Sequence, residues 1–212
     1  MQRDREPFIS LTFYRLFKWS VVMPMLYTYF QGRIYGIEQV PRRGPLVVVG
    51  NHASDFDPPI LASCIHRPVA FMAKEELFRV PLLGPAIQVY GAYPVKRGSP
   101  DRSAIRAAMA SLEEGWAAGL FLQGTRTPDG RISSPKLGAA MIAAKAKAPL
   151  LPVSIWGTHG ILPKGVRFPQ PVAVTVRIGA PLPPPQSTKR EHLEAVTQKC
   201  VDAIHHLHDL GR

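Results

Sequence analysis

A histidine and an aspartate stand five positions apart in the segment Asn51-His52-Ala53-Ser54-Asp55-Phe56-Asp57, directly after the apolar run Leu46–Val49. A neutral imidazole can take a proton from a hydroxyl near pH 7. A carboxylate bonded to the other ring nitrogen fixes the tautomer and stabilises the imidazolium that forms. The pair therefore predicts general-base chemistry, with His52 as the base and Asp57 as the group that orients it.

The two side chains can meet only in a particular local structure. Along a continuous helix, five residues would rotate them about 140° apart, so His52 must lie on a loop and Asp57 must begin a helix. Ser54 or Asp55 is expected to cap that helix, the two prolines after Asp57 suit its first turn, and residues 60–65 continue it. The helix dipole favours an ionised Asp57 at this position.

Two other interpretations of the pair stay open on these residues alone. His52 and Asp57 could be two ligands of a metal ion, or a structural histidine beside a helix-capping aspartate. No third and fourth ligand occurs at metal-ligand spacing in the sequence, so we expect no metal. Taken alone, the pair suggests catalysis without establishing it.

The length and the cysteines bound the fold. A chain of 212 residues is long enough for one sizeable core and short for two, which predicts a single domain with a terminal appendage. Cys64 and Cys200 stand far apart without a partner pattern. They indicate a reducing compartment and read as packing residues rather than as a disulfide or a zinc site.

The charge balance indicates anionic partners. Lys and Arg outnumber Asp and Glu by 26 to 15, giving a net charge of +11. Such a field attracts nucleic acid, an acidic membrane surface, or phosphorylated substrates and carriers. The sequence lacks a zinc-finger spacing, an aromatic RNA-binding signature and a lysine-rich block, so we expect no nucleic acid partner.

The N-terminal segment is apolar but too short to span a bilayer. Arg15 and Lys18 interrupt residues 8–30 and leave only Trp19 to Phe30 uncharged, whereas a bilayer core needs about 20 apolar residues. We expect an interfacial helix or hairpin, with its aromatic rings near headgroup level and the two cations facing lipid phosphates. An amphipathic helix packed on the domain is the alternative.

Beyond this segment, apolar strand-like runs alternate with helical patterns, which is typical of an α/β fold. We expect a single domain with a mixed central sheet flanked by helices over residues 33–212, and an N-terminal membrane-interfacial helical segment over residues 1–32. The expected strands are Arg33–Ile37, Pro45–Val49, Val69–Met72, Ala92–Val95, Leu120–Leu122, Leu150–Ile155 and Val172–Ile178.

Three helices are expected between and after these strands. A capping box, Thr188-Lys189-Arg190-Glu191, predicts the start of the last helix. Three histidines near its end, at 205, 206 and 208, are expected to be solvated or favoured by the helix dipole rather than metal ligands. The predicted buried faces are Ile105, Ala108, Met109, Leu112 and Trp116 in the first helix, Leu137, Met141 and Ala144 in the second, and Leu193, Val196, Cys200, Val201, Ile204 and Leu207 in the last.

Three further segments, residues 91–98, 121–127 and 151–158, contain glycine or a hydroxyl, and in the first two a cation, beside strand-like runs. Glycine permits tight turns, and arginine recognises phosphate through a bidentate fork. Arg97 and Arg126 could therefore form an anion clamp. Each segment alone also fits a solvated strand end.

Together with the His52 segment, these stretches resemble, in order and spacing, the glycerolipid acyltransferase family of PlsC-like 1-acyl-sn-glycerol-3-phosphate acyltransferases. The resemblance spans residues 33 to about 180. It implies that His52 is the general base, Asp57 its orienter, and that other residues bind substrate. The implied substrate-binding residues are Lys96, Arg97, Gln123, Gly124, Thr125, Arg126, Pro152 and Ser154.

The sequence departs from the family pattern at two positions. Gln123 stands where the family commonly has a glutamate, which keeps hydrogen bonding but loses the charge. Lys96 stands where an acidic residue is common, which makes the implied phosphate pocket more cationic.

The resemblance implies transfer of a fatty acyl group from an acyl carrier protein or coenzyme A thioester to the 2-hydroxyl of lysophosphatidic acid, giving phosphatidic acid, without a cofactor. Direct transfer is expected, because no Gly-x-Ser-x-Gly pattern occurs and neither cysteine has a basic partner. We expect a peripheral protein on an anionic membrane surface at the cytoplasmic face. The alternatives are a glycerol 3-phosphate or other lysophospholipid acceptor, and a non-catalytic basic membrane-binding protein.

Overall fold

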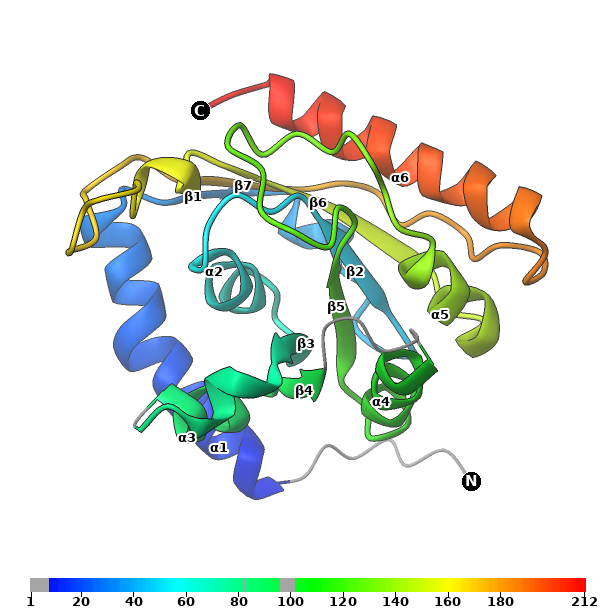
Figure 1. The fold of residues 1–212 in the computed structure, drawn as a ribbon, viewed down its shortest axis with the longest axis horizontal. Coiled ribbons are helices and arrows are strands. Elements are labelled where there is room, and N and C mark those ends of the chain that lie inside the picture. The colour runs from blue at the N-terminus through cyan, green and yellow to red at the C-terminus, as the bar shows by residue number, and fades with distance from the viewer. Residues whose placement is uncertain (1–7, 82, 96–101) are drawn as a thin grey trace.

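The computed structural model describes residues 8–81, 83–95 and 102–212 (Figure 1). Within these residues, seven strands form one sheet in the order β1-β7-β6-β2-β5-β3-β4. Only the β6–β7 pair among these strands is antiparallel, so the sheet is mixed, as predicted. The strands are β1 (Arg33–Tyr35), β2 (Val47–Gly50), β3 (Val69–Lys74), β4 (Tyr93–Val95), β5 (Ala117–Phe121), β6 (Leu150–Trp156) and β7 (Thr175–Ile178).

All seven predicted strand runs are confirmed, but β5 begins at Ala117 rather than Leu120. Its first three residues are small and lack the large apolar side chains that indicate a strand in a sequence. A Cβ on Gly119 would lie 2.5 Å from the Phe71 ring, so the small residue gives that ring room against the sheet.

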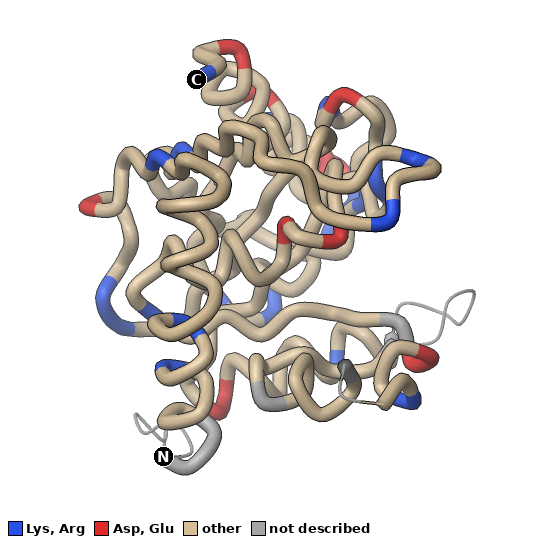
Figure 2. Tube along the Cα trace, turned by 90° about the vertical axis from the view of Figure 1, so that its left-hand side faces the viewer, with Lys and Arg blue, Asp and Glu red and all other residues tan. Residues whose placement is uncertain are grey.

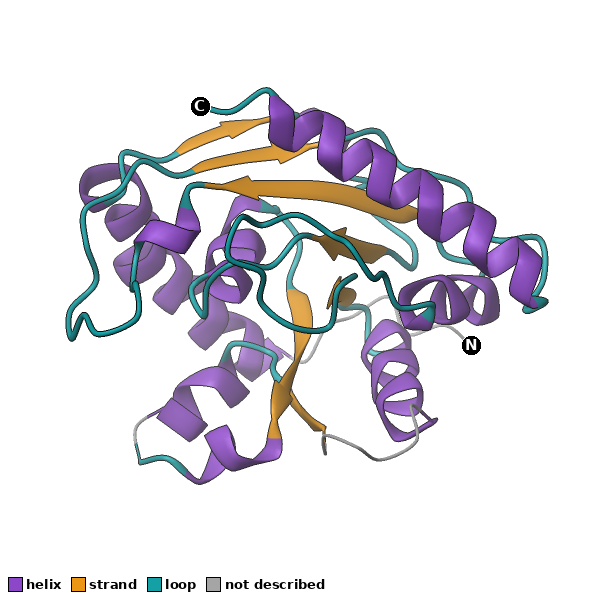
Figure 3. Ribbon diagram, turned by 45° about the horizontal axis from the view of Figure 1, so that its top comes forward, coloured by secondary structure: helices purple, strands orange, loops and turns teal. Residues whose placement is uncertain are grey.

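The helices cover both faces of the sheet (Figure 3). On one face, α2 and the N-terminal helical segment share a core with Val48 and Leu151, and on the other, α4, α5 and α6 share a core with Val47 and Val49. The helices are α1 (Phe8–Phe17), η1 (Lys18–Val22), η2 (Met25–Tyr29), η3 (Ile37–Gln39), α2 (Asp57–Cys64), η4 (Glu75–Arg79), α3 (Leu83–Val89), α4 (Arg102–Glu113), α5 (Gly138–Ala146), η5 (Thr158–Gly160) and α6 (Arg190–Asp209).

The central register determines where the site lies. Gly50, the last residue of β2, pairs with Phe121 at the end of β5 on one side and with Val153 of β6 on the other. These three strands are parallel, so their carboxyl ends reach the same edge of the sheet. The segments that follow β2 and β5 are therefore neighbours in space.

The N-terminal helical segment packs on the domain along one side, where Tyr14, Leu26 and Phe30 are buried. Lys18 is 7% exposed and donates a hydrogen bond from Nζ to the carbonyl oxygen of Ile65, at 2.7 Å. The prediction that Lys18 faces lipid phosphates is therefore wrong. Its long aliphatic stem is buried and its ammonium satisfies a carbonyl just beyond the end of α2, while burial lowers the pKa of the amine.

The other side of this segment is apolar and open. Phe13, Leu16 and Trp19 are 53%, 62% and 64% exposed, and Tyr27 is 51% exposed. None of the helices in the described part of the chain is both long and apolar enough to cross a bilayer.

Two predicted helix faces need correction. The helix α4 ends at Glu113, and Gly115 turns the chain with φ of +89°, so Trp116 lies beyond the helix and packs against Tyr14 on the opposite face of the sheet. In α5 the predicted residues Leu137, Met141 and Ala144 are only partly buried. Three alanines that allow close helix packing and one isoleucine form the buried face instead: Ala139, Ala140, Ala143 and Ile142.

The last helix is predicted largely correctly. In α6, Leu193, Cys200 and Ile204 are buried as expected. The predicted capping box does not form, because the N-cap residue is Lys189 and makes no side-chain cap bond. Ser187 acts in this turn instead, accepting a hydrogen bond from the backbone N–H of Lys189 at 3.2 Å.

The basic excess is distributed over the folded body. Figure 2 shows Lys and Arg residues on loops and helices at both the left and the right of the molecule, rather than in one element. This agrees with a net charge of +11 that no single tail carries.

Candidate functional site

The His52 and Asp57 side chains meet. The distance from His52 Nδ1 to Asp57 Oδ2 is 2.9 Å, with the aspartate side chain fully buried and the histidine side chain 16% exposed. An ionised carboxylate only accepts hydrogen bonds, so the Nδ1 atom carries the proton in the neutral ring. The Nε2 atom is then left with a lone pair, which is the state of a general base.

Asp57 also organises the loop that carries the histidine. Its Oδ2 atom accepts hydrogen bonds from the backbone N–H groups of Ala53 and Ser54, at 2.6 and 2.7 Å. These donors compensate the buried negative charge, and the start of α2 adds its dipole. The prediction that Ser54 or Asp55 caps α2 is wrong, because the N-cap residue is Phe56 and makes no side-chain cap bond.

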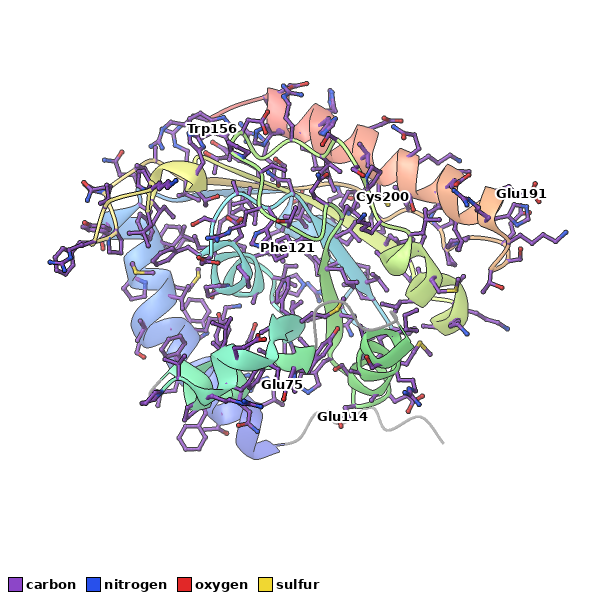
Figure 4. The ribbon with its side chains drawn as sticks, in the orientation of Figure 1. Glu75, Glu114, Phe121, Trp156, Glu191 and Cys200 are labelled. Atoms are coloured by element: carbon purple, nitrogen blue, oxygen red, sulfur yellow. The ribbon has the colours of Figure 1, made fainter. Side chains whose placement is uncertain are left out.

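An aromatic ring fixes the plane of the imidazole. The His52 ring stacks on Phe121, with centroids 4.1 Å apart and an angle of 10° between planes, and Phe121 in turn stacks on Phe71. Figure 4 labels Phe121 near the centre of the molecule, at the end of β5. Sequence patterns alone gave Phe121 no individual role. Its place at the end of an apolar run, close to the Gly124 turn, could have marked it as a site residue.

Asn51 fixes the backbone just before His52. Its side chain is buried and forms two hydrogen bonds with the backbone of Ile155: Nδ2 donates to the carbonyl oxygen at 2.9 Å, and Oδ1 accepts from the N–H at 2.8 Å. The amide thus joins the end of β2 to β6. Sequence reasoning noted Asn51 only as part of the motif.

Residues 123–136, which we call the strap, cover the other side of the His52 loop. The backbone N–H and hydroxyl of Thr127 both approach the His52 carbonyl oxygen, at 2.8 and 3.2 Å. Gln123 braces the strap from within, because its Oε1 atom accepts from the N–H groups of Ser133 and Ser134 at 3.0 and 2.9 Å. A glutamate could accept the same two bonds, so the strap geometry does not require a negative charge here.

The strap also carries an exposed cation that contacts the His52 loop. Arg126 forms an ion pair with Asp55, and their side chains are 53% and 72% exposed. Gly124 takes a φ of +72° in the turn that leads to it, a conformation that favours glycine. The guanidinium is thus held beside the His52 loop on the solvent side.

Comparison with known proteins shows to which family the chain belongs. Residues 31–156 match the profile of the family described as Acyltransferase, which covers more than half of the chain. The chain belongs to the acyltransferase family.

Individual relatives of this acyltransferase are consistent with that assignment. The chloroplastic 1-acyl-sn-glycerol-3-phosphate acyltransferase BAT2 of Brassica napus is 34% identical over 143 residues, which are 66% of this chain and 41% of that protein. The 1-acyl-sn-glycerol-3-phosphate acyltransferase of Borreliella burgdorferi is 30% identical over 148 residues, 68% of this chain and 59% of that protein. The chain therefore spans about two fifths to three fifths of these curated relatives.

A solved structure extends the likeness to the fold. The crystal structure of the 1-acyl-sn-glycerophosphate acyltransferase PlsC from Thermotoga maritima matches with a TM-score of 0.74 and 30% sequence identity. The match covers 94% of this chain and 80% of that one. Almost all of the described acyltransferase fold, including both faces of the sheet, is thus shared.

The remaining predicted site residues differ in placement. Lys96 and Arg97 lie outside the described residues. Thr125 is exposed on the strap, whereas Pro152 lies within β6 opposite Val49. Ser154 is 1% exposed, and its hydroxyl lies 3.2 Å from His208 Nδ1 rather than facing an open surface.

The two thiols, both in the described part of the chain, are poor nucleophiles. Burial raises the pKa of Cys64 and of Cys200 to about 12, so both thiols stay protonated and poorly nucleophilic. Within residues 8–81, 83–95 and 102–212, no three His, Cys, Asp or Glu side chains gather as metal ligands would.

Proposed function

We propose that this acyltransferase transfers a fatty acyl group from an acyl thioester to the 2-hydroxyl of lysophosphatidic acid, giving phosphatidic acid in phospholipid synthesis. The observation that carries the proposal is the His52–Asp57 pair, held at 2.9 Å with Nε2 free to act as a base. The relatives' names, 1-acyl-sn-glycerol-3-phosphate acyltransferase, support this acceptor.

The reaction proceeds in one transfer without a covalent enzyme intermediate or a cofactor. His52 Nε2 takes the proton of the acceptor hydroxyl as the oxygen attacks the thioester carbonyl carbon. The tetrahedral intermediate collapses, the C–S bond breaks, and the thiolate takes the proton back from the imidazolium. Asp57 stabilises the imidazolium between these steps, and the Phe121 stack keeps the ring in its plane.

Cations near the His52 loop bind the acceptor phosphate in this proposal. Arg126 lies on the strap and exchanges its Asp55 partner for the phosphate, which arginine can bind through two hydrogen bonds and which carries more charge than a carboxylate. Lys96 and Arg97, which lie outside the described residues, are proposed as further phosphate ligands. The acyl donor is an acyl carrier protein or coenzyme A thioester, both of which are anionic and suit a net charge of +11.

We propose that residues 1–32 form a membrane-interfacial segment and that residues 33–212 form the catalytic domain. The exposed apolar side of α1, η1 and η2 supports this, because contiguous exposed apolar surface suits a lipid interface. The protein then acts as a peripheral enzyme on the anionic cytoplasmic face of a membrane.

A loop beside this segment extends the proposed membrane surface. Phe168 is 76% exposed, and Lys164 and Arg167 flank it on the same exposed loop. The Tyr29 hydroxyl donates a hydrogen bond to the Pro169 carbonyl oxygen at 2.8 Å, which fastens the loop to the end of η2. Aromatic and basic side chains side by side suit an anionic bilayer surface.

The test is acyl transfer by the purified protein from a labelled acyl thioester to a panel of acceptors on anionic vesicles. We expect diacyl product with lysophosphatidic acid, and about a 10²- to 10⁴-fold loss of rate in His52→Ala. His66→Ala, which changes an exposed histidine beyond α2, should leave the rate unchanged.

Other outcomes of that panel redirect the proposal. Preference for glycerol 3-phosphate or another lysophospholipid would change the acceptor while keeping the mechanism. Vesicle binding without any acylated product would indicate a non-catalytic membrane-binding protein.

A further inference from the structure

Three separate parts of the chain converge on His208, near the end of α6. Its Nε2 atom lies 3.1 Å from the carbonyl oxygen of Asp129 on the strap. Its Nδ1 atom lies 3.2 Å from the Ser154 hydroxyl in β6 and 3.5 Å from Nδ2 of Asn51. These contacts span between 54 and 157 positions of sequence, so they depend on the finished fold.

The partners determine the tautomer of His208. A carbonyl oxygen can only accept, so Nε2 carries the proton and Nδ1 is the acceptor. The Asn51 amide is oriented independently, since its oxygen accepts from the Ile155 N–H and one amide hydrogen goes to the Ile155 carbonyl. Its second amide hydrogen is the one left for His208 Nδ1. A neutral ring with the proton on Nε2 therefore suits all three neighbours.

Packing at this junction leaves no room for a side chain on the strap. A Cβ added to Gly130 would lie 2.8 Å from Asn51 Nδ2 and 3.1 Å from His208 Cε1, and the residue has φ of +71°. The strap backbone therefore packs tightly against Asn51 at the point where His208 fastens it.

Two further contacts tie the strap to the same end of α6. The backbone N–H of Ile132 donates to His205 Nε2 at 3.0 Å, and Arg131 pairs with Asp209. The expectation that the C-terminal histidines are merely solvated is wrong for His205 and His208, whereas His206 is exposed.

The contacts lead from α6 to the base. Thr127, two residues before Asp129, donates to the carbonyl oxygen of His52, and Asn51 precedes His52 in the chain. We propose that His208 is a positioning residue for the site: as the neutral Nε2–H tautomer it fastens the strap and supports Asn51, and so keeps His52 aligned with the acceptor hydroxyl. This inference rests on the proposed function, in which His52 is the base.

The electrostatic surroundings of His208 fit this role. The charged and titratable groups around the ring are Asp129 and Arg131 of the strap and His205 and Asp209 of α6, while Asn51 and Ser154 are neutral. Burial is the largest influence and lowers the pKa of His208, which favours the neutral ring that the geometry requires.

The test compares His208→Ala with His206→Ala, a matched change on an exposed side chain of the same helix. We expect His208→Ala to lower kcat about 10-fold with the KM of both substrates changed less than about twofold, because alignment rather than binding is lost. His206→Ala should match wild type. His208→Gln, whose amide N–H can replace the bond to Asp129, should recover most of kcat.

A second readout does not need turnover. The ¹⁵N resonances of the His52 ring report which nitrogen carries the proton, and in wild type they should indicate the Nδ1–H form held by Asp57. In His208→Ala these resonances should move toward each other as the ring samples both tautomers, while His206→Ala leaves them in place.

The outcomes separate this inference from the proposed function. A wild-type protein that makes no diacyl product contradicts the proposed function, whereas an active wild type with unchanged kcat and His52 resonances in His208→Ala overturns the positioning role. Should His208→Ala not fold, Gly130→Ala tests the same junction: lowered kcat supports the inference, and wild-type kcat refutes it.

Discussion

His52 is held by two parts of the molecule, one close to it in the sequence and one far from it. On one side, Asp57 stands five positions away and bonds both the imidazole and the two backbone N–H groups that follow it. On the other side, Thr127 holds the His52 carbonyl from 75 positions away, and Ile155 holds Asn51 from 104. The tautomer of the proposed base is set locally, whereas its alignment depends on contacts that only the folded chain brings together.

We expect the largest effect on kcat from a change at Asp57, the local partner of His52. In Asp57→Asn the amide can donate to Nδ1 and shift the ring proton to Nε2, so we expect kcat to fall about 10²- to 10⁴-fold. Asp55→Asn, on the exposed carboxylate two positions earlier, should leave kcat unchanged. Steady-state kinetics at saturating acceptor decide this, with far-ultraviolet circular dichroism to confirm folding. A kcat within about twofold of wild type in Asp57→Asn would remove the carboxylate from the mechanism.

The strap cation should act on binding. Arg126→Ala should raise the KM for lysophosphatidic acid about 10-fold with little change in kcat, because a charge-assisted phosphate contact is lost. Asp55→Ala, which frees the guanidinium from its ion pair, should leave that KM equal or lower. The same acceptor dependence in wild type and Arg126→Ala would refute the assignment.

Substitutions at Gln123 test whether the strap depends on the hydrogen bonds of this side chain or on its lack of charge. Gln123→Ala removes the acceptor of two backbone N–H groups and should lower the free energy of unfolding by about 1 kcal/mol. Gln123→Glu keeps both bonds and should match wild type within about 0.5 kcal/mol. Urea denaturation with both variants measures the difference. Equal loss in the two variants would mean that the negative charge disrupts the strap.

The smallest effect concerns pH. The pKa of His208 is lowered below its usual value of 6.5, so the unfolded chain binds the proton more readily than the folded one. The stabilisation by the neutral ring is therefore complete above about 6.5 and is lost as pH falls through the folded value. The melting temperature of wild type should fall more between pH 7.5 and pH 5 than that of His208→Gln. Parallel pH curves would contradict this.

Sequence reasoning succeeded where the signal was local. The seven strand runs and the His52–Asp57 pairing follow from hydrophobic patterning and from chemistry within six residues. It erred where a residue's partner lay far along the chain. Lys18 looks like an interfacial cation, but Ile65, 47 positions away, provides a carbonyl for it.

The predictions for Trp116 and His208 are also wrong, and their causes differ. Trp116 continues a helical stripe on paper, yet a turn at Gly115 sends it to the other face of the sheet. His208 looks solvated because its partners lie 54 to 157 positions away, and no periodicity in α6 encodes them. Gly130 is the sequence feature that marks this junction, because it has a positive φ and no space for a Cβ.

The anchorage of the strap on α6 also orders events during synthesis. The segment from Asn51 to Asp57 leaves the ribosome early and contains everything needed to join base and carboxylate. The strap follows, but its attachment points at His205, His208 and Asp209 are translated 73 to 79 residues after the strap residues they hold. The contacts that align the proposed base are therefore complete only after α6 has been synthesised.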